Sequence, residues 1–384
     1  MRFVRLGDCT TKIGSGQTPS GGHRAYSTSG IPLIRSQNVL MGCFTTDGLA
    51  FISAQIDEQM RGTRVVRNDV LLNITGASIG RVCVVPDEIC PANVNQHVCI
   101  IRCSDVLLPA YLALVLASPE FQSLIWQDQA GATRQALTKD MVESFQIPWR
   151  PIEEQRQIAA RLKAKLAEVE TARQAAQAQL REVSSLADAI VLDSVRNHSV
   201  TEHSLGDVLA EVKRGIGARW SDYPVLGATR DGLAPAKEAP GKHAIKYKPV
   251  LPGTVFYNPM RILIGSIAFV DDGDTPGITS PDYVVLQGKP DLVDSRWFYY
   301  WLRSPLGVAC INSLARGAVR ERMLFNRLAE GEIELPAYSV QQRASTALQE
   351  LVPLKRIVAA QLAEIERLPQ KLLAQAFTHR GETE

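Results

Sequence analysis

Several short stretches of the sequence resemble catalytic or nucleotide-binding motifs, and each lacks a residue that the chemistry needs. Gly76-Ala77-Ser78-Ile79-Gly80-Arg81 begins like a phosphate-binding loop, but its glycine spacing is wrong and no lysine follows. A tight turn between two strands explains these glycines better. Asn258-Pro259-Met260-Arg261 starts like the Asn-Pro-Pro-aromatic loop of amino-methyltransferases and then departs from it. The sequence therefore predicts a protein without a catalytic centre of its own.

Metal-binding side chains are also poorly spaced. A metal-dependent nuclease needs an acidic residue two positions before a lysine, and the stretch after Pro281-Asp282 offers Gln287-Gly288-Lys289 instead. Cysteines and a histidine gather between residues 83 and 103, but structural zinc needs two close pairs, and only Cys99 and Cys103 form one. We expect no metal bound by this chain. The seven cysteines show no disulfide framework, so we expect reduced thiols.

Polar loops containing arginine remain as binding candidates, and nucleic acid suits their chemistry. Arginine supplies 30 of the 42 basic residues, and its planar fork matches guanine edges and phosphates. A GC-rich genome would also favour arginine, so composition alone leaves the question open. The candidate contacts in the first half of the chain are Arg35, Ser36, Gln37, Asn38, Asn93, Asn95, Gln96, Thr133, Arg134 and Gln135. Those in the second half are Lys213, Arg214, Arg219, Arg230, Arg261, Arg316, Arg320 and Arg322.

Glycine-led arginine loops occur in both halves because the chain repeats itself. From residue 69 onward, the offset between matching stretches stays near 185–188 residues, in unchanged order. One chance match is common, but seven in the same order indicate two copies of one unit of about 190 residues. The matches include Leu6-Gly7-Asp8 with Leu205-Gly206-Asp207, Ser118-Pro119 with Ser304-Pro305, Gly131-Ala132 with Gly317-Ala318, and Gln155-Arg156 with Gln342-Arg343.

Each copy has a globular part followed by a helical part. The globular parts mix short β-branched runs, such as Val70-Leu71-Leu72-Asn73-Ile74, with short helical stretches and with Gly, Pro and Asn. The helical parts are rich in Ala, Glu, Gln, Arg and Leu, which favour helix. The sequence therefore predicts an α+β protein with an internal pseudo-two-fold repeat. Two α/β globular domains, at 1–150 and 198–338, are joined by two long helices, at 151–197 and 339–384.

Apolar residues seven positions apart predict that the two helices pack on each other as an antiparallel coiled coil. A long linking domain between the helices permits this direction. At 1.5 Å per residue, residues 162–190 would span roughly 40 Å, close to the length of one DNA turn. Pro353 and Pro369 predict a kink or a late start in the second helix. The expected seam consists of Leu162, Leu166, Val169, Ala176, Leu180, Val183 and Ile190 in the first helix, with Arg173 as a charged intruder, and of Leu351, Leu354, Val358, Ile365, Leu368 and Leu372 in the second.

Composition and charge exclude several classes of protein. Hydrophobic residues at 45% and charged residues at 21% are ordinary for a globular protein and exclude a disordered chain or a collagen-like fibre. No apolar run is long enough to span a membrane, and the N-terminus lacks the apolar core of a signal peptide. We therefore expect a cytoplasmic protein. The net charge of +2 gives no overall basic field.

The order of the motifs resembles that of a known family. The pattern extends over nearly the whole chain and includes residues 32–39, 69–76, 78–80 and 93–97, Ile147-Pro148 with residues 151–158, and residues 368–377. Duplicated around two helices, this pattern resembles the specificity (S) subunits of type I restriction–modification enzymes. The second copy departs more, because Gly277-Ile278-Thr279-Ser280-Pro281 replaces the Asn-Val-Asn-Gln stretch of the first. Divergence of this kind is expected if the two copies read different DNA sequences.

The resemblance implies a non-catalytic reader of double-stranded DNA with two target recognition domains, one for each half of a split, asymmetric site. The helices would fix the gap and dock two methyltransferase (M) subunits, which would bind S-adenosylmethionine and methylate adenine N6. Restriction (R) subunits would add ATP- and Mg-dependent translocation and cleavage. No cofactor is expected on this chain. The alternatives are the specificity chain of a type II-like or other defence methyltransferase system, a self-contained DNA-modifying enzyme, and a structural coiled-coil scaffold.

Overall fold

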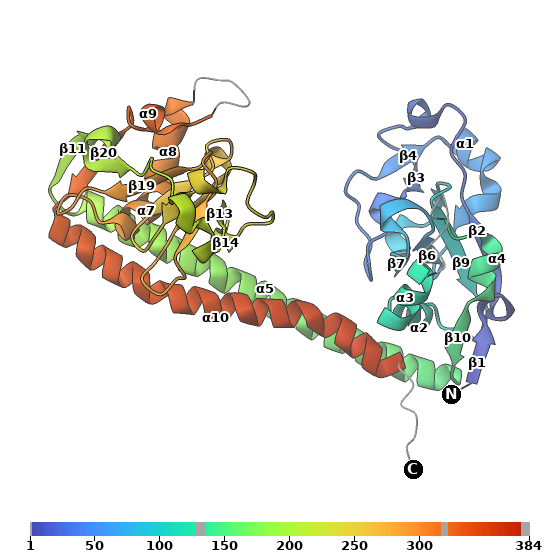
Figure 1. Ribbon diagram of the computed structural model, residues 1–384. Helices are drawn as coiled ribbons and strands as arrows, with labels where there is room; N and C mark the ends of the chain where they lie inside the picture. Colours follow the sequence, from blue (N-terminus) through green and yellow to red (C-terminus); the bar gives the residue numbers. More distant parts are fainter. Residues whose placement is uncertain (1, 128–135, 316–321, 378–384) are drawn as a thin grey trace, which may run out of the picture. The chain divides into compact units, whose positions relative to one another are not determined.

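The computed structural model describes residues 2–127, 136–315 and 322–377 (Figure 1). The chain divides into two compact units, one of Met1–Gln174 with Ala363–Glu384 and one of Ala175–Leu362. We call them unit 1 and unit 2 and describe each by itself. Both contain a globule and a part of each of two long helices, α5 (Ile152–Arg196) and α10 (Tyr338–Phe377). No helix in the described part of the chain is long and apolar enough to cross a membrane.

Three sheets form the globule of unit 1. An antiparallel sheet has the order β2-β9-β6-β7, a second has the order β4-β3-β8-β5 with β3 and β8 parallel, and β1 pairs with β10. The strands are β1 (Arg2–Arg5), β2 (Thr10–Ser15), β3 (Ile31–Ile34), β4 (Ala50–Ile52), β5 (Arg64–Val65), β6 (Val70–Asn73), β7 (Val82–Val84), β8 (Ala92–Val94), β9 (Val98–Cys103) and β10 (Gln146–Trp149). The helices are α1 (Ala54–Gln59), α2 (Pro109–Leu116), α3 (Pro119–Gln127) and α4 (Lys139–Ser144).

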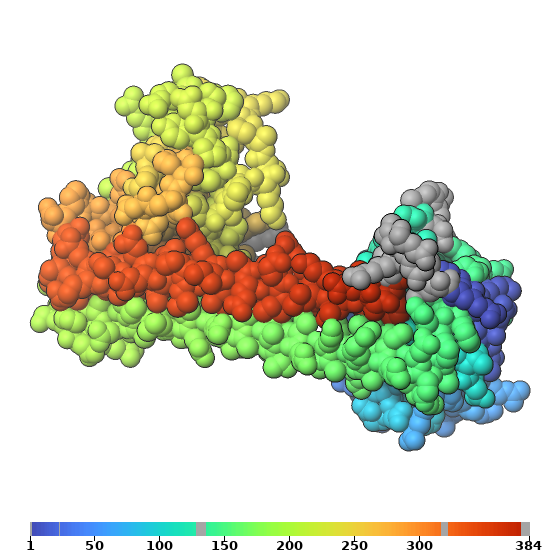
Figure 2. Space-filling model, turned by 90° about the horizontal axis from the view of Figure 1, so that it is seen from below, coloured from blue at the N-terminus to red at the C-terminus, as the bar shows by residue number. Residues whose placement is uncertain are grey.

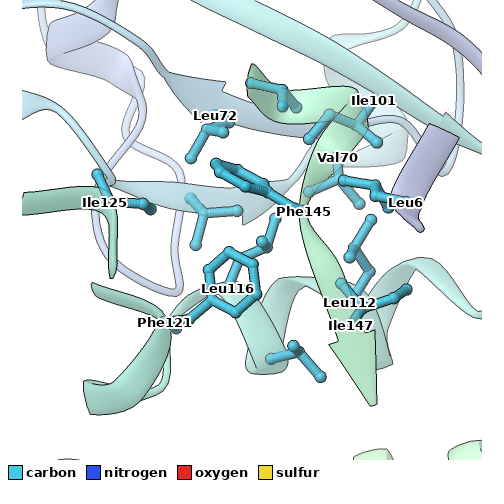
Figure 3. Packing of buried hydrophobic residues seen from close by; sticks show 14 of the residues in the cluster. Leu6, Val70, Leu72, Ile101, Leu112, Leu116, Phe121, Ile125, Phe145 and Ile147 are labelled. Carbon is cyan, nitrogen blue, oxygen red and sulfur yellow. The ribbon is translucent and has the colours of Figure 1, made fainter. Parts of the chain in front are cut away.

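The central strands of unit 1 read as continuous apolar runs because both of their faces are covered. On β6, Val70 and Leu72 face a core shared with α2, α3 and the ends of α5 and α10, whereas Leu71 faces the second sheet. Figure 3 shows the first of these cores, where Phe145 and Phe121 meet edge to face with ring centroids 5.0 Å apart. The globule is therefore packed directly on its part of the long helices.

The globule of unit 2 repeats this topology. Its four-stranded sheet has the order β12-β19-β16-β17, β11 pairs with β20, β13 with β14 and β15 with β18, and a parallel bridge joins Val225 to Ile278 as β3 joins β8. The strands are β11 (Val200–Ser204), β12 (Leu209–Glu211), β13 (Leu226–Thr229), β14 (Gly232–Pro235), β15 (Lys248–Val250), β16 (Val255–Tyr257), β17 (Ile267–Phe269), β18 (Gly277–Thr279), β19 (Val284–Gly288) and β20 (Glu332–Pro336). The helices are α6 (Leu205–Val208), α7 (Ser295–Arg303), α8 (Pro305–Leu314) and α9 (Phe325–Leu328).

The two topologies confirm the internal repeat and correct one of its matches. The pairing Val70↔Ile101 corresponds to Val255↔Leu286, an offset of 185 in both strands. Sequence comparison matched Gln155 with Gln342, but the structure places Gln341 in the equivalent position, because Gln155 and Gln341 are both fully buried and Gln342 is exposed. Two adjacent glutamines made the register ambiguous in the sequence.

The long helices lie side by side within each unit, running antiparallel (Figures 1 and 2). Among the predicted seam residues, Leu162 and Ile365 are buried in unit 1, and Ala176, Val183 and Val358 are buried in unit 2. Leu166, Val169, Leu180, Ile190, Leu351 and Leu372 are half-buried. This arrangement agrees with the predicted coiled coil.

The prediction that Leu354 and Leu368 of α10 lie in the seam is wrong. Leu354 is 46% and Leu368 37% exposed. Leu348 (fully buried) and Leu362 (half-buried) contribute to the seam instead, and they lie four rather than three residues after the buried Ala344 and Val358. Positions three and four residues away flank the same helical stripe on opposite sides, so periodicity alone did not fix which side faces α5. The helix also begins at Tyr338 and continues through both prolines, so the late start is wrong.

Candidate nucleic-acid interface

The loop that follows β3 holds four of the predicted contact residues of unit 1, and one of them is buried. Arg35 lies over the ring of Tyr26, with the guanidinium carbon 5.5 Å from the ring centroid, and donates to the carbonyl of Gly48. Asn38 is fully buried and donates to the carbonyls of Thr45 and Asp47 at 3.1 and 3.2 Å. Asn38 therefore shapes the loop, while Ser36 and Gln37 remain accessible.

The other two predicted asparagines of unit 1 are also structural. Asn93 is fully buried, donates to Asp57 at 2.7 Å and accepts from Thr63 at 2.6 Å. Asn95 is 7% exposed, and its side-chain oxygen accepts from the backbone N–H of His97 at 3.1 Å. Buried amides need partners, and these amides have found them inside the chain. Asn38, Asn93 and Asn95 are thus corrected from candidate contacts to residues that hold the loops.

The accessible residues meet in a groove of about 440 Å³ on unit 1. Sequence analysis had selected Ser36 and Gln37, and missed the remainder of the lining, because nothing local marks it. The imidazole of His97 is held from two sides, with Nδ1 2.5 Å from the Thr75 hydroxyl and Nε2 2.9 Å from the amide nitrogen of Gln96. The lining residues are Ser36, Gln37, Thr75, Gly76, Ala77, Ser78, Arg81 and His97. Hydroxyl, amide, imidazole and guanidinium groups give the groove both donors and acceptors, as base edges and phosphates require.

The turn at the floor of the groove also spells Gly-x-Ser-x-Gly, the nucleophile elbow of α/β hydrolases, which sequence analysis overlooked. A nucleophile elbow joins a strand to a helix, whereas this turn joins the antiparallel strands β6 and β7. Both ring nitrogens of His97 are engaged with Thr75 and Gln96, and no hydrogen bond joins His97 to Ser78 in the described part of the chain. The turn is therefore a connection between strands and not a hydrolytic site.

The equivalent turn of unit 2 carries larger side chains. Gly80 and Gly265 both have positive φ, +84° and +82°, which closes the two turns in the same way. Exposed Met260, Leu263 and Ile264 stand where unit 1 has Thr75, Ser78 and Ile79. The predicted contacts Arg261 and Arg230 are exposed beside them, and Arg230 donates to the carbonyl of Ile264 at 3.3 Å. Unit 2 thus offers arginines and apolar side chains on the face where unit 1 offers small polar ones.

Two further predicted cations of unit 2 line a cavity of about 390 Å³. Arg322 pairs with Asp282 at 3.1 Å, and Lys213 with Glu211 at 3.5 Å. Lys248, which sequence analysis missed, donates to the carbonyl of Tyr283 at 2.7 Å, and burial lowers the pKa of its ammonium group. The cavity therefore mixes donors and acceptors. Arg214 and Arg219 are exposed, and Arg219 pairs with Asp222.

The arginine loops that the sequence singled out lie outside the described residues. These positions are Thr133, Arg134, Gln135, Arg316 and Arg320. The chain re-enters the described part at equivalent places, where Ala136 bridges to Thr75 and the N–H of Met323 donates to Pro259 at 3.1 Å. Within the described ranges, no group of histidine, cysteine and carboxylate side chains is placed to hold a metal ion.

Comparison with known proteins finds a family model that resembles the first part of the chain. Residues 1–179 match the model of the type I restriction modification DNA specificity domain. The type I restriction enzyme EcoBI specificity subunit of Escherichia coli is 32% identical over 171 residues, which are 44% of this chain and 35% of that protein. The alignment thus spans about a third of the length of this curated relative.

Three solved structures share the fold over almost their entire length. A chain from a structure of complex assembly in a type I restriction–modification system has a TM-score of 0.66 at 19% identity, covering 99% of this chain and 98% of that one. The specificity subunit from M. genitalium gives 0.53 at 13% identity, covering 98% and 96%. The HsdS subunit from Thermoanaerobacter tengcongensis gives 0.50 at 18%, covering 99% and 97%.

Proposed function

We propose that this chain belongs to the family of type I restriction modification DNA specificity domains, whose model residues 1–179 match, and that it is the DNA-specificity subunit of a type I restriction–modification complex. The observation that carries this proposal is the family match of unit 1 together with the same strand topology in unit 2. A chain that contains this domain topology twice is equipped to read a site of two parts.

Each globule reads one half of a bipartite, asymmetric DNA site. In unit 1 the groove around Ser36, Gln37, Arg81 and His97 presents groups that suit base edges and phosphates. In unit 2 the arginines beside the β16–β17 turn and the cavity around Arg322 play the same part. The different side chains of the two faces fit two different half-sites. The chain itself acts as an adaptor without a catalytic role.

The paired helices fix the unread gap and dock partner subunits. Two methyltransferase subunits supply S-adenosylmethionine binding and adenine methylation, and restriction subunits supply ATP- and Mg-dependent cleavage. A net charge of only +2 supports this division, because partner subunits then provide much of the phosphate contact. The complex works on DNA in the cytoplasm of a bacterium or archaeon.

A genome-wide map of adenine methylation tests the proposal. Cells that express this chain with its neighbouring methyltransferase gene are compared with cells that lack only this chain. We expect a split motif with a fixed unread gap that disappears without the chain. A methylation pattern that does not depend on the chain, although the two proteins co-purify, would refute the role of DNA reader.

A further inference from the structure

A buried glutamine joins the start of helix α5 to the globule of unit 1. Gln155 lies in the first turn of α5 and is fully buried. Its side-chain oxygen accepts from the N–H of Leu108 at 2.8 Å, and its amide nitrogen donates to the carbonyls of Val106 and Arg150 at 2.9 and 2.8 Å. One side chain thus ties the helix to the N-cap of α2 and to the end of β10.

A second glutamine does the same at the start of helix α10 in unit 2. Gln341 is fully buried in the first turn of α10. Its side-chain oxygen accepts from the N–H of Asp294, the N-cap of α7, at 3.0 Å. Its amide nitrogen donates to the carbonyls of Leu292 and Pro336 at 3.0 and 2.9 Å. All three partners lie 186 residues after those of Gln155, so the arrangement is repeated atom by atom.

The partners have changed in type while the bonds have stayed the same. Val106, Leu108 and Arg150 of unit 1 correspond to Leu292, Asp294 and Pro336 of unit 2. Every bond from the glutamine goes to backbone, so the globule can change its side chains without losing the attachment. Only an amide offers one acceptor and two donors in a rigid plane at this reach, which explains why glutamine stands at both places.

We propose that Gln155 and Gln341 are positioning residues, which fix the direction in which each globule is mounted on its helix and so restrict the complex to one gap between its half-sites. The inference rests on the proposed function and adds to it the attachment that sets the reading geometry. Residues on the DNA-facing loops determine which bases are read, whereas these two glutamines determine the spacing between the two half-sites. A shift of about 1 Å in positioned groups is enough to change rates strongly.

The test uses the full chain in complex with its methyltransferase partner and DNA duplexes that carry both half-sites. The duplexes contain the natural gap, or a gap one base pair shorter or longer. We expect the wild-type complex to prefer the natural gap, and Gln155→Met and Gln341→Met to lower this preference by roughly tenfold without changing either half-site sequence. Gln157→Met and Gln342→Met are the matched controls, because both glutamines are exposed on the same helix turns, and they should behave like wild type.

Gln155→Glu keeps the measurement informative if the methionine variant does not fold. A glutamate can still accept from Leu108 but donates nothing when ionised, and burial beside carbonyl oxygens favours its protonated form. We therefore expect gap preference in this variant to recover as the pH falls, because the protonated carboxyl regains one donor.

Two outcomes overturn the inference. Variants that lose activity on all three duplexes in proportion to their folded fraction, with the gap preference unchanged, would make the glutamines structural only. If the exposed control variants also lower the gap preference, that preference does not depend on the two buried glutamine side chains in particular. A wild-type complex that methylates no split site would instead refute the proposed function, so the two failures are distinguishable.

Discussion

Units 1 and 2 close the same backbone turn with different side chains. In both units the turn between the third and fourth strands of the four-stranded sheet ends on a glycine with positive φ, and the same main-chain bonds bracket it. The N–H of Asn73 donates to Arg81 at 2.8 Å, and the N–H of Asn258 donates to Ser266 at 3.2 Å. Unit 1 fills the turn with Ala77 and Ser78, whereas unit 2 fills it with Ile262 and Leu263.

The comparison shows that backbone hydrogen bonds and buried apolar contacts maintain the shared fold. The exposed side chains of the turn differ between the two units. The DNA reader proposed above would need this separation, because each half would have to change its sequence preference without losing its fold. The separation is incomplete, however, since unit 1 also contains a buried ion pair that unit 2 lacks. Asp69 is fully buried and accepts from Arg102 at 2.8 Å, while the equivalent residues of unit 2 are Thr254 and Gln287.

The largest expected effect comes from breaking this ion pair. Asp69→Ala leaves the partly buried guanidinium of Arg102 without its carboxylate and also removes the acceptor of the Val66 N–H, so we expect unit 1 to lose about 3–5 kcal/mol. Thr254→Ala at the equivalent place removes one hydroxyl bond to Leu251, and we expect a loss of about 1 kcal/mol from unit 2. Hydrogen exchange resolved by unit measures both losses. Equal losses would show that the pair contributes nothing beyond an ordinary hydrogen bond.

The second prediction separates the two proposed DNA-reading faces. Arg134→Ala should weaken DNA binding or methylation by about 1–3 kcal/mol and relax only one half-site, if this residue reads a base. Arg322→Ala should act on the other half-site alone, because Arg322 lines the cavity of unit 2. Methylation mapping of the variant complexes measures both effects.

Arg156→Ala, an exposed arginine on helix α5, is the control for this pair of variants and should change neither half-site. An unchanged methylation rate and motif in Arg134→Ala would remove that residue from the interface. Relaxation of both half-sites by one variant would contradict the assignment of one globule to each half.

The third prediction compares two buried aromatic residues at equivalent positions. The hydroxyl of Tyr111 donates to the carbonyl of Pro148 at 2.8 Å, and the indole N–H of Trp297 donates to Ser194 of helix α5 at 2.9 Å. Tyr111→Phe should cost unit 1 about 1 kcal/mol, and Ser194→Ala should cost unit 2 up to about 2 kcal/mol, because it leaves a buried N–H unpaired. Urea unfolding of both variants measures the losses. If Tyr111→Phe lowered the free energy of unfolding more than Ser194→Ala, the order would be reversed. The hydrogen bond to the Pro148 carbonyl would then stabilise the protein more than the bond of the Trp297 indole.

The fold was predictable because its signals are local or repeated. The runs that became β6 and β9 are apolar in the sequence, and the helix-forming composition after Pro151 announced α5 without reference to distant residues. The offset between the copies then gave the duplication. Leu354 and Leu368 were misplaced because a heptad pattern does not decide on which side of its stripe the second row lies.

The candidate site was less predictable because its side chains form hydrogen bonds with residues that are distant in the sequence. Asn93 looked like a surface amide, but its partner Asp57 lies 36 residues earlier in the chain. His97 gained its orientation from Thr75, 22 residues away, and no local pattern marks that contact. Side chains that hold a loop and side chains that face a ligand have the same types, and only the fold separates them.

The smallest expected effect concerns the charged intruder in the helix seam of unit 1. Arg173 binds Glu170 through two bonds of 2.7 Å and occupies the row in which unit 2 has Leu180. These bonds lower the pKa of Glu170 to about 2. A carboxyl with a lowered pKa in the folded state adds stability above its ordinary pKa, and this contribution is lost as the pH falls toward 2. Since Arg173 and Glu170 are both open to solvent, the contribution is small and screened by salt.

Placing each residue type at the other position, in two separate variants, measures this contribution of the ion pair. Arg173→Leu should leave Tm unchanged or raise it slightly at neutral pH, because an apolar side chain suits the row, and it should flatten the loss of Tm on acidification. Leu180→Arg should lower Tm, because the half-buried leucine of unit 2 has no acid three residues before it; residue 177 there is a glutamine. Calorimetry between neutral and acid pH measures both. A fall in Tm for Arg173→Leu would mean that the ion pair, and not the apolar row, holds this part of the seam.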